Sequence, residues 1–350
     1  MKIKDVIQYL ESIAPTVYQA SYDNAGLIVG DAQQEVKGVL CCLDSTEAIV
    51  EEAAEKSCNL IVAHHPIVFK GLKSLTGRNY VERVVIQAIK HDIAIYAIHT
   101  NLDSVYHKGV NEKICEKLGL KQTEILAPTQ SLKKLNVFVP PAQSEQIQQA
   151  LFDAGAGTLG KKQGLSYASS GERTNKGKTS AEVKIEVFFP MAIQGQVLAV
   201  LRQSTEGREP LYELTAIENH NPLVGSGMIG QLAEPMEEEA FLKHLKEAMS
   251  VNVIRHTALF GKPIQTVAVC GGAGGFLLGA AKGRKADVFI TADYKYHEFF
   301  DADGQIIIAD IGHFESEQFT IELLQQLISE KFSNFAAYST EVVTNPVHYL

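Results

Sequence analysis

Two adjacent histidines, His64 and His65, follow the apolar run Leu60-Ile61-Val62-Ala63 and precede Pro66. Each imidazole brings a hydrogen-bond donor and an acceptor that a buried strand must satisfy. Because neighbouring side chains of an extended backbone project in different directions, the pair suits two neighbouring metal ions better than one. A hydrogen-bonded structural pair is the alternative interpretation.

Two further strand-like segments end in residues of similar chemistry. Residues 93–98 run into His99-Thr100-Asn101-Leu102-Asp103, and residues 305–310 run into Gly312-His313-Phe314-Glu315-Ser316-Glu317. Ligands of parallel α/β sheets lie outside the carboxyl ends of the strands. We therefore expect the three loops to converge on one metal site.

The predicted metal ligands are the residues of these loops that carry an imidazole or a carboxylate, namely His64, His65, Asp103, His313 and Glu317. His313 and Glu317 share one helix face at i and i+4, where a surface pair is the alternative. Asp103 either supplies the negative charge that offsets a divalent ion or caps a helix. His99 can support the metal ligands without binding the metal itself. Mixed imidazole and carboxylate ligands predict two divalent ions per chain, zinc, iron or manganese.

Two other features carry possible chemistry. Asp293 and His297 have the spacing of a helix face, so they are candidate catalytic acid–base groups or simply a solvated helix start. The run of residues 271–275, Gly-Gly-Ala-Gly-Gly, lies between a predicted strand and helix. Its amides suit a phosphate, whereas its lack of side chains suits close strand–helix packing.

The segments that must position these residues alternate between helix and strand. Before residue 127 the pattern predicts helices at 3–14, 46–56, 80–91 and 109–118 and strands at 37–43, 59–63 and 93–98. After residue 224 it predicts helices at 237–249 and 315–330 and strands at 264–270, 286–290 and 305–309. This alternation predicts an α/β fold with a mostly parallel sheet, or sheets, and crossover helices.

Residues 128–223 follow a different pattern. Their predicted order is β-α-β-β-α-β, the ferredoxin-like α+β arrangement, with a strand at 164–169 followed by a polar loop at 171–178. We expect a ferredoxin-like domain inserted into a discontinuous α/β domain of residues 1–127 and 224–350.

Composition excludes several function classes. A net charge of −9 and the absence of a basic–aromatic stripe make a nucleic-acid partner unlikely. No run reaches the roughly 18 apolar residues of a membrane span, and the N-terminus opens an amphipathic helix, so we expect a cytoplasmic protein with no membrane contact. Five cysteines, an odd number, fit reduced thiols, and Cys41 and Cys42 fit a buried strand.

With these residues assembled, the sequence resembles the NGG-one-interacting-factor-three-like family, whose members are also called GTP cyclohydrolase 1 type 2 homologues. The resemblance covers essentially the whole chain. It is carried by six segments: Tyr22–Gly30, Leu43–Glu47, Ala63–Phe69, His99–Asp103, Gly312–Glu317 and Thr344–Leu350.

The resemblance implies a dinuclear centre in which His65 and Asp103 bind one ion, His64 and His313 bind the other, and Glu317 bridges. It also implies a toroidal homohexamer, a trimer of dimers, and an insert similar to the PII and CutA-like proteins. The sequence departs from the family at Tyr22, where tryptophan is frequent, and at Ser204–Pro210, where the insert usually reads His-Pro-Tyr-Glu-Glu-Pro.

These observations predict a metal-dependent hydrolase acting on a nucleotide or phosphoester. The cyclohydrolase label adds GTP as a substrate by resemblance alone. The alternative is a non-enzymatic metal-binding or regulatory assembly in which the inserted domain senses a ligand or gates the ring. Turnover by metal-loaded protein discriminates between the two hypotheses.

Overall fold

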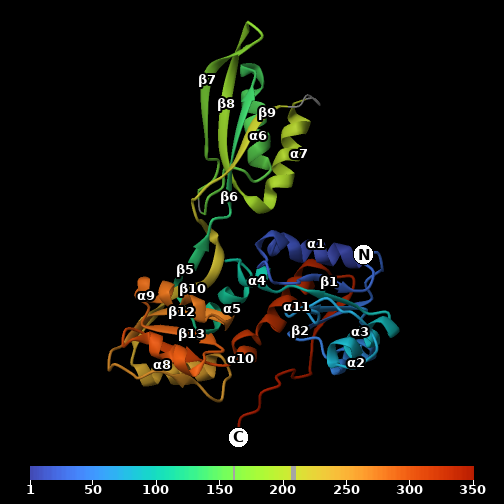
Figure 1. Cartoon of the computed structure of the whole chain (residues 1–350), viewed down its shortest axis with the longest axis vertical. Coiled ribbons are helices and arrows are strands. Elements are labelled where there is room, and N and C mark those ends of the chain that lie inside the picture. Colours follow the sequence, from blue (N-terminus) through green and yellow to red (C-terminus); the bar gives the residue numbers. More distant parts are fainter. Residues whose placement is uncertain (161, 206–209) are drawn as a thin grey trace. The chain divides into compact units, whose positions relative to one another are not determined.

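A computed structural model describes residues 1–160, 162–205 and 210–350 of the chain. Its contacts divide the chain into two compact units, Met1–Ala127 with Gly225–Leu350, and Pro128–Val224 (Figure 1). Within the described ranges, no helix has both the length and the apolar character needed to cross a membrane.

The first sheet of the larger unit has the strand order β1-β4-β3-β2-β15. Its strands are β1 (Gly26–Val29), β2 (Gly38–Cys42), β3 (Leu60–Ala63), β4 (Ala94–Ala97) and β15 (Ala336–Ser339). Strands β15, β2, β3 and β4 are parallel, and β1 pairs antiparallel with β4. Every residue of β2, β3 and β4 is buried, which explains their continuous apolar runs.

Helices cover both faces of this sheet. The helices α2 (Glu47–Glu55) and α3 (Tyr80–Lys90) share one core with β2, β3 and β4. The α2 helix begins after Thr46, whose hydroxyl accepts a hydrogen bond from the Ile49 amide at 3.4 Å. On the other face, α1 (Ile3–Ile13) buries Ile3, Val6 and Leu10, at the spacing that the sequence predicts.

The second sheet of this unit has the order β11-β14-β13-β12-β10-β5. Its strands are β5 (Lys121–Thr129), β10 (Asn221–Met236), β11 (Arg255–His256), β12 (Ile264–Ala273), β13 (Val288–Ala292) and β14 (Ile307–Asp310). Strands β12, β13 and β14 are parallel. The remaining helices of this unit include α5 (Val110–Lys117), α8 (Glu238–Ala248) and α9 (Leu278–Gly283), and α11 (Thr320–Lys331) packs on β2 and β15 of the first sheet.

One buried core joins the two sheets. It contains Val62 of β3 and Tyr96 of β4 from the first sheet, Val269 of β12 and Ala309 of β14 from the second, and residues of α5 and α11. The mixed α/β class is as predicted, but the helix–strand alternation did not show how the strands divide between two sheets. Strands β1, β5, β10, β11 and β15 were not predicted at all.

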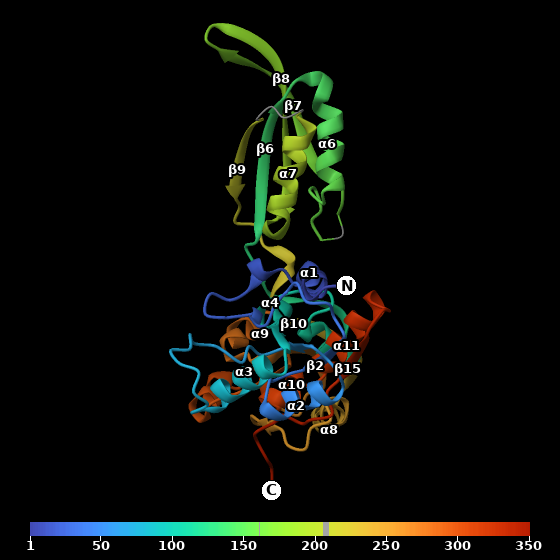
Figure 2. The same ribbon diagram turned by 90° about the vertical axis from the view of Figure 1, so that its right-hand side faces the viewer.

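The smaller unit contains β6 (Leu132–Val139), α6 (Ser144–Asp153), β7 (Ser166–Asn175), β8 (Lys178–Pro190), α7 (Gln194–Ser204) and β9 (Leu211–Ala216). The strands form an antiparallel sheet of order β7-β8-β6-β9, and α6 packs beside α7 (Figure 2). The unit therefore has the β-α-β-β-α-β order and a core of its own.

The polar loop predicted at residues 171–178 is wrong, because these residues continue β7 and begin β8. Asn175 pairs with Lys178 across a two-residue turn in which Lys176 and Gly177 have φ of 48° and 79°. Positive φ at both positions is the hairpin geometry of a type I′ turn. Both faces of the hairpin tip are exposed, so no apolar alternation marks it. Most of the atypical Ser204–Pro210 stretch lies outside the described residues.

Candidate metal centre

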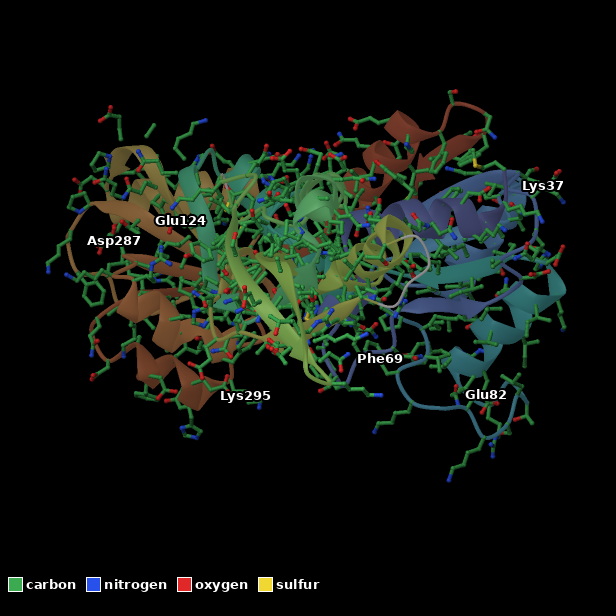
Figure 3. All side chains as sticks on the ribbon, turned by 90° about the horizontal axis from the view of Figure 1, so that it is seen from above. Lys37, Phe69, Glu82, Glu124, Asp287 and Lys295 are labelled. Atoms are coloured by element: carbon green, nitrogen blue, oxygen red, sulfur yellow. The ribbon has the colours of Figure 1, made fainter. Side chains whose placement is uncertain are left out.

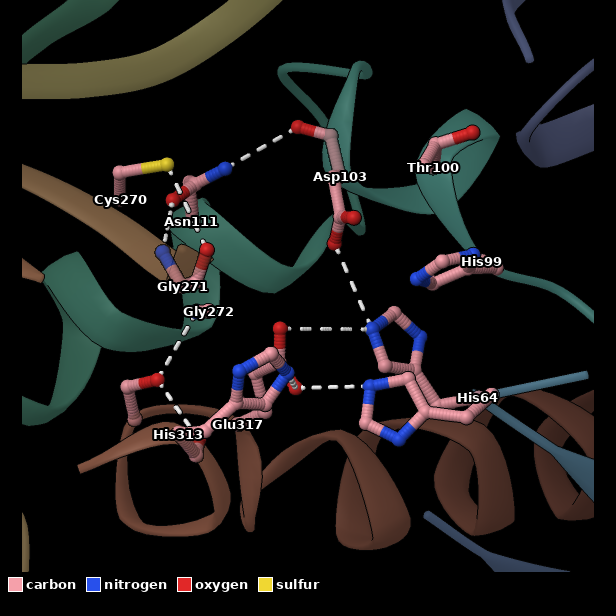
Figure 4. A network of polar contacts seen from close by, with 12 residues as sticks. His64, His99, Thr100, Asp103, Asn111, Cys270, Gly271, Gly272, His313 and Glu317 are labelled. Atoms are coloured by element: carbon pink, nitrogen blue, oxygen red, sulfur yellow. Dashed lines mark hydrogen bonds and ion pairs between the residues drawn. The ribbon is translucent and has the colours of Figure 1, made fainter. Parts of the chain in front are cut away.

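The carboxyl ends of β3 and β4, in the first sheet, lie beside a short helix that follows a strand of the second sheet. His64 and His65 directly follow β3, and α4 (Thr100–Asp103) follows β4 after His99. The short helix α10 (His313–Glu317) follows β14. Figure 4 shows the side chains of His64, Asp103 and Glu317 pointing toward one another. The structure thus brings the five predicted ligands together, from both sheets.

Among the described residues, three donor groups could hold an ion: two of them share Glu317, and the third consists of His64, His65 and His99. Glu317 Oε2 lies 3.0 Å from His65 Nε2 and 3.2 Å from His313 Nε2. Glu317 Oε1 lies 3.7 Å from His64 Nε2, which is 3.6 Å from Asp103 Oδ1. Atoms about 2.0–2.2 Å from a common ion have separations of this size. His64 therefore groups with Asp103, and His65 with His313, which exchanges the two histidines relative to the pairing that the resemblance implied.

Four ligand atoms of the cluster are buried and have no hydrogen-bond partner: His64 Nε2, His65 Nε2, Asp103 Oδ1 and Glu317 Oε2. His64 is 0% exposed and Glu317 is 3% exposed. Leaving such atoms unsatisfied costs about 1–3 kcal/mol each, so a native structure needs a reason for them. A divalent cation would satisfy these atoms, and the imidazole and carboxylate donor set fits one.

The histidines are held so that the same ring nitrogen faces the cluster. In each of four imidazoles, Nδ1 lies within 2.9 Å of an oxygen acceptor. The pairs are His64 with the Ile98 carbonyl (2.9 Å), His65 with Asp44 (2.9 Å), His99 with Asp23 (2.8 Å) and His313 with Asp293 (2.8 Å). Because these oxygens accept, Nδ1 carries the proton and Nε2 presents its lone pair to a metal.

His99 lies closer to the centre than the sequence suggested. One of its ring nitrogens is within 4.8 Å of ligand nitrogens of both His64 and His65. Its partner Asp23 also accepts hydrogen bonds from the amide and hydroxyl of Thr100. Burial raises the pKa of Asp23, but the hydrogen bonds from His99 and Thr100 outweigh burial and lower that pKa to about 2. Asp23 is therefore ionised and orients His99.

The two ligand carboxylates differ in their electrostatics. Burial raises the pKa of Glu317, but the adjacent imidazoles of His313, His64 and His65 outweigh it and hold that pKa well below its usual value. Burial, assisted by the charge of Glu317, raises the pKa of Asp103 to about 7. Glu317 is thus the permanent anion around which the imidazoles are arranged.

The imidazoles respond to these anions. Burial lowers the pKa of His65, but Asp44 and Glu317 outweigh it and raise that pKa to about 10. The hydrogen bond to Glu317, together with Asp293, raises the pKa of His313 to about 9 against the effect of burial. A cation that binds here takes the place of protons on these rings.

The glycine run packs against Glu317, one of the candidate metal ligands. Strand β12 continues through Gly272, whose φ is +63° and whose Cβ, if present, would lie 2.5 Å from Glu317 Oε1. The amides of Gly271, Gly272 and Gly274 donate to Asn111 Oδ1, Ser316 Oγ and Thr291 Oγ1. Since these amides are already bonded within the protein, close packing is the interpretation that the structure supports, not phosphate binding.

Asp293 and His297 do not share a helix face. Asp293 has a left-handed φ of 60°, and the 3₁₀ helix η5 (Tyr296–Ala302) begins only after it. Asp293 reaches the centre by accepting the hydrogen bond of His313 Nδ1. His297 is exposed and packs against Tyr296, with ring centroids 5.2 Å apart. The expected helix-face spacing is therefore wrong, Asp293 holds the ring of His313, and a catalytic role for Asp293 and His297 remains a prediction.

Sequence reasoning missed two residues that orient the ligands. Asp44 follows β2, so the strand-end rule that selected His64 also applied to it. Asp44 instead entered only as part of the resemblance. Asp23 precedes β1, and only the folded chain brings it to His99, so no local pattern marks it.

Comparison with known proteins agrees with this geometry. The chain is 38% identical over 364 residues to the "GTP cyclohydrolase 1 type 2 homolog" of Halalkalibacterium halodurans, covering 98% of this chain and 96% of that one. It is 32% identical over 367 residues to the protein of the same name from Bacillus subtilis, covering 99% and 98%.

Solved structures give the same result. A Bacillus cereus protein related to NIF3 superposes with a TM-score of 0.86 at 33% identity, covering 100% of this chain and 99% of that one. A Staphylococcus aureus protein superposes with a TM-score of 0.83 at 30% identity, with the same coverage. The model of the DUF34/NIF3 (NGG1p interacting factor 3) family matches residues 1–347. The chain is therefore a member of the DUF34/NIF3 family.

Proposed function

We propose that the chain binds two divalent metal ions, one through His64 and Asp103 and the other through His65 and His313, with Glu317 shared. The observation that carries the proposal is that the two oxygens of Glu317 face separate donor groups whose buried atoms lack partners. Zinc, iron and manganese are the ions that this donor set favours.

The function that such a centre supports best is hydrolysis of a phosphoester or nucleotide. When bound, a pair of divalent ions lowers the pKa of water and stabilises the negative charge that develops on attack. The chain's own groups orient the reaction: Asp44 and Asp293 fix the ligand rings, and His99, held by Asp23, is placed to accept or donate a proton. The name of the relatives, which refers to the nucleotide GTP, supports a nucleotide substrate.

The test combines metal content with turnover. Protein stripped with a chelator and reloaded with zinc, manganese or iron(II) is analysed for metal and assayed against phosphomonoesters, phosphodiesters and nucleotides. We expect hydrolysis that Glu317→Ala abolishes and that Glu322→Ala, a change in the neighbouring helix α11, leaves unchanged. Two bound ions without any turnover would instead favour a metal-binding or regulatory assembly.

We propose that the protein forms a homohexamer, a trimer of dimers, in which a closed ring limits access to the metal centre. Closed symmetric assemblies are the usual form of homo-oligomers, and the family resemblance supports six chains. The smaller unit, with its β-α-β-β-α-β order, is proposed to be a PII- or CutA-like domain that gates this ring. Light scattering should give the mass of about six chains, and a stable monomer would contradict the ring.

A further inference from the structure

A long loop follows the metal-ligand pair directly. Residues 66–79 connect His65 to α3 and contain no helix or strand. Loops of more than about 12–15 residues without secondary structure are uncommon and are usually functional or disordered. This loop begins next to His65, a proposed metal ligand. The contacts that hold its backbone decide whether it is a functional or a disordered loop.

Both ends of the loop are fixed by hydrogen bonds. Near its start, Asn24 Nδ2 donates to the Val68 carbonyl at 2.6 Å. Near its end, the buried carboxylate of Glu82 accepts from the amide of Thr76 at 2.8 Å and from the amide of Arg78 at 3.2 Å. The loop is thus held at the site, and residues 69–75 project between the two anchors.

The projecting segment carries an aromatic ring beside the metal ligands. Phe69, labelled in Figure 3, is 52% exposed, and its ring lies edge-on to His99 with centroids 5.9 Å apart. The His99 ring is in turn 5.3 Å from the rings of His64 and of His65. Only one imidazole therefore separates Phe69 from two predicted ligands. The exposed part of the Phe69 ring is therefore available to contact a molecule bound beside His99.

The same segment carries positive charge. Lys70 and Lys73 are exposed, and within the described ranges neither forms an ion pair. Tyr22, which is 74% exposed, directly precedes Asp23, the aspartate that holds the His99 ring. Free ammonium groups attract an anion, and an exposed ring stacks on a planar one.

We propose that residues 66–79 form the substrate-recognition loop of the centre, and that Phe69 selects a substrate with an aromatic or heteroaromatic ring next to its phosphoryl group. Lys70 and Lys73 attract the anionic group without discriminating between rings. This inference rests on the proposed function and names the substrate class that it handles. A nucleobase and a simple phenyl ring share the chemistry that Phe69 recognises.

The test uses two phosphonates that cannot be hydrolysed, so that binding is measured apart from turnover. Zinc-loaded full-length protein is titrated calorimetrically with phenylphosphonate and with methylphosphonate. We expect phenylphosphonate to bind about tenfold more tightly, because one stacking contact provides a factor of this order. Phe69→Leu should remove this preference, Phe69→Tyr should keep it, and Phe300→Leu, a matched exposed control, should leave it unchanged. Changing Lys70 and Lys73 to Gln should weaken both phosphonates equally.

The absence of tryptophan from the chain provides an independent readout. Tyr22→Trp introduces a single tryptophan near the loop, and we expect phenylphosphonate, but not methylphosphonate, to change the emission of this tryptophan when it is excited selectively. Equal affinities for the two phosphonates in the parent protein, or a ring preference that persists in Phe69→Leu, would overturn the proposal. A ring preference without hydrolysis of any ester would overturn the proposed function alone, whereas hydrolysis without a ring preference would overturn only this inference.

Discussion

Gly272 leaves room for the shared carboxylate Glu317. A Cβ on Gly272 would lie 2.5 Å from Glu317 Oε1 and 3.3 Å from His313 Cε1, and the φ of +63° disfavours any side chain. The glycine run thus lets the backbone of β12 approach the carboxylate that two of the three candidate donor groups share.

Gly272→Ala is therefore expected to reduce the metal content to well below one ion per chain. The added methyl group must displace either Glu317 or the strand, and the positive φ adds roughly 1 kcal/mol of strain or more. Gly279→Ala in α9 is the matched control, since its Cβ meets nothing within 4 Å. Elemental analysis of both variants after identical metal loading measures the difference. Full metal content in Gly272→Ala would show that Glu317 is not a ligand.

The shared position of Glu317 predicts an asymmetry among the ligand variants. In the proposed assignment, Glu317→Ala removes a donor from both ion sites and should lose both ions, whereas His65→Ala removes a donor from only one site and should retain about one ion per chain. Metal-to-protein ratios after dialysis against a weak chelator separate these results. If both variants lose the same number of ions, the two groups do not form separate sites.

The C-terminal segment supports the centre through Asp44. Thr344 Oγ1 donates to Asp44 Oδ2 at 2.8 Å, and Asp44 Oδ1 holds His65. Groups that orient a metal-binding histidine typically contribute about 10–100-fold to the affinity for the metal. Thr344 contacts the orienting group, Asp44, and not the histidine itself. We expect Thr344→Val to weaken one ion by roughly 10-fold or less, measured by chelator competition. Val343→Ala, at a 74% exposed neighbour, should have no effect.

The candidate ligands could be predicted because each lies within a few residues of a strand end. The alternation of apolar runs with amphipathic helices locates those ends, and the rule for parallel sheets then brings their loops together. The pairing of ligands could not be predicted in this way, since whether His64 or His65 faces Asp103 depends on side-chain directions after β3. The supporting residue Asp23 depends on a contact with His99 across the sheet.

Exposure explains why β15 and the second half of β7 were missed. Strand β15 is mostly exposed and short, and the part of β7 beyond the strand predicted at 164–169 is exposed on both faces, so neither shows the apolar pattern by which strands are recognised. The division of strands between two sheets depends on long-range pairing, such as β15 with β2, which no local pattern contains. At Asp293 the sequence suggested a helix that the structure does not contain. The left-handed backbone of this residue interrupts the helical spacing.

A buried glutamate attaches the C-terminal strand to α2 and makes stability depend on pH. Glu52 accepts hydrogen bonds from Thr340 Oγ1 and from the Glu341 amide, and Lys56 Nζ lies 3.0 Å away. Burial raises the pKa of Glu52, but these contacts outweigh it and the pKa falls below the ordinary value of 4.5. A lowered pKa in the folded protein means that the stabilisation is complete above pH 4.5 and is lost as the pH falls through the folded-state pKa.

Glu52→Gln should therefore lower the free energy of unfolding by about 1–2 kcal/mol at pH 7, and this difference from the parent should shrink below pH 4.5. Urea unfolding between pH 7 and pH 3, with chelator present throughout, measures it without a metal contribution. Glu55→Gln on the exposed face of α2 is the control. A difference that stays constant across this pH range would rule out an ionised Glu52 as its cause.

The smaller unit should be removable without loss of the metal centre. The chain leaves the larger unit at Ala127 and returns at Gly225, and β5 and β10, the strands that lead there, are neighbours in one sheet. Thr129 Oγ1 donates to the Val224 carbonyl at 3.3 Å, so the two crossing segments lie side by side and a short linker can join them. Because each unit has its own buried core, deleting residues 128–223 should remove no apolar contact of the other. We expect the shortened protein to unfold cooperatively and to bind as much zinc as the parent, measured by thermal denaturation and elemental analysis.

A shortened protein that is unfolded would show that the insert completes the core. A shortened protein that is folded but binds no zinc would show that the insert completes the metal centre.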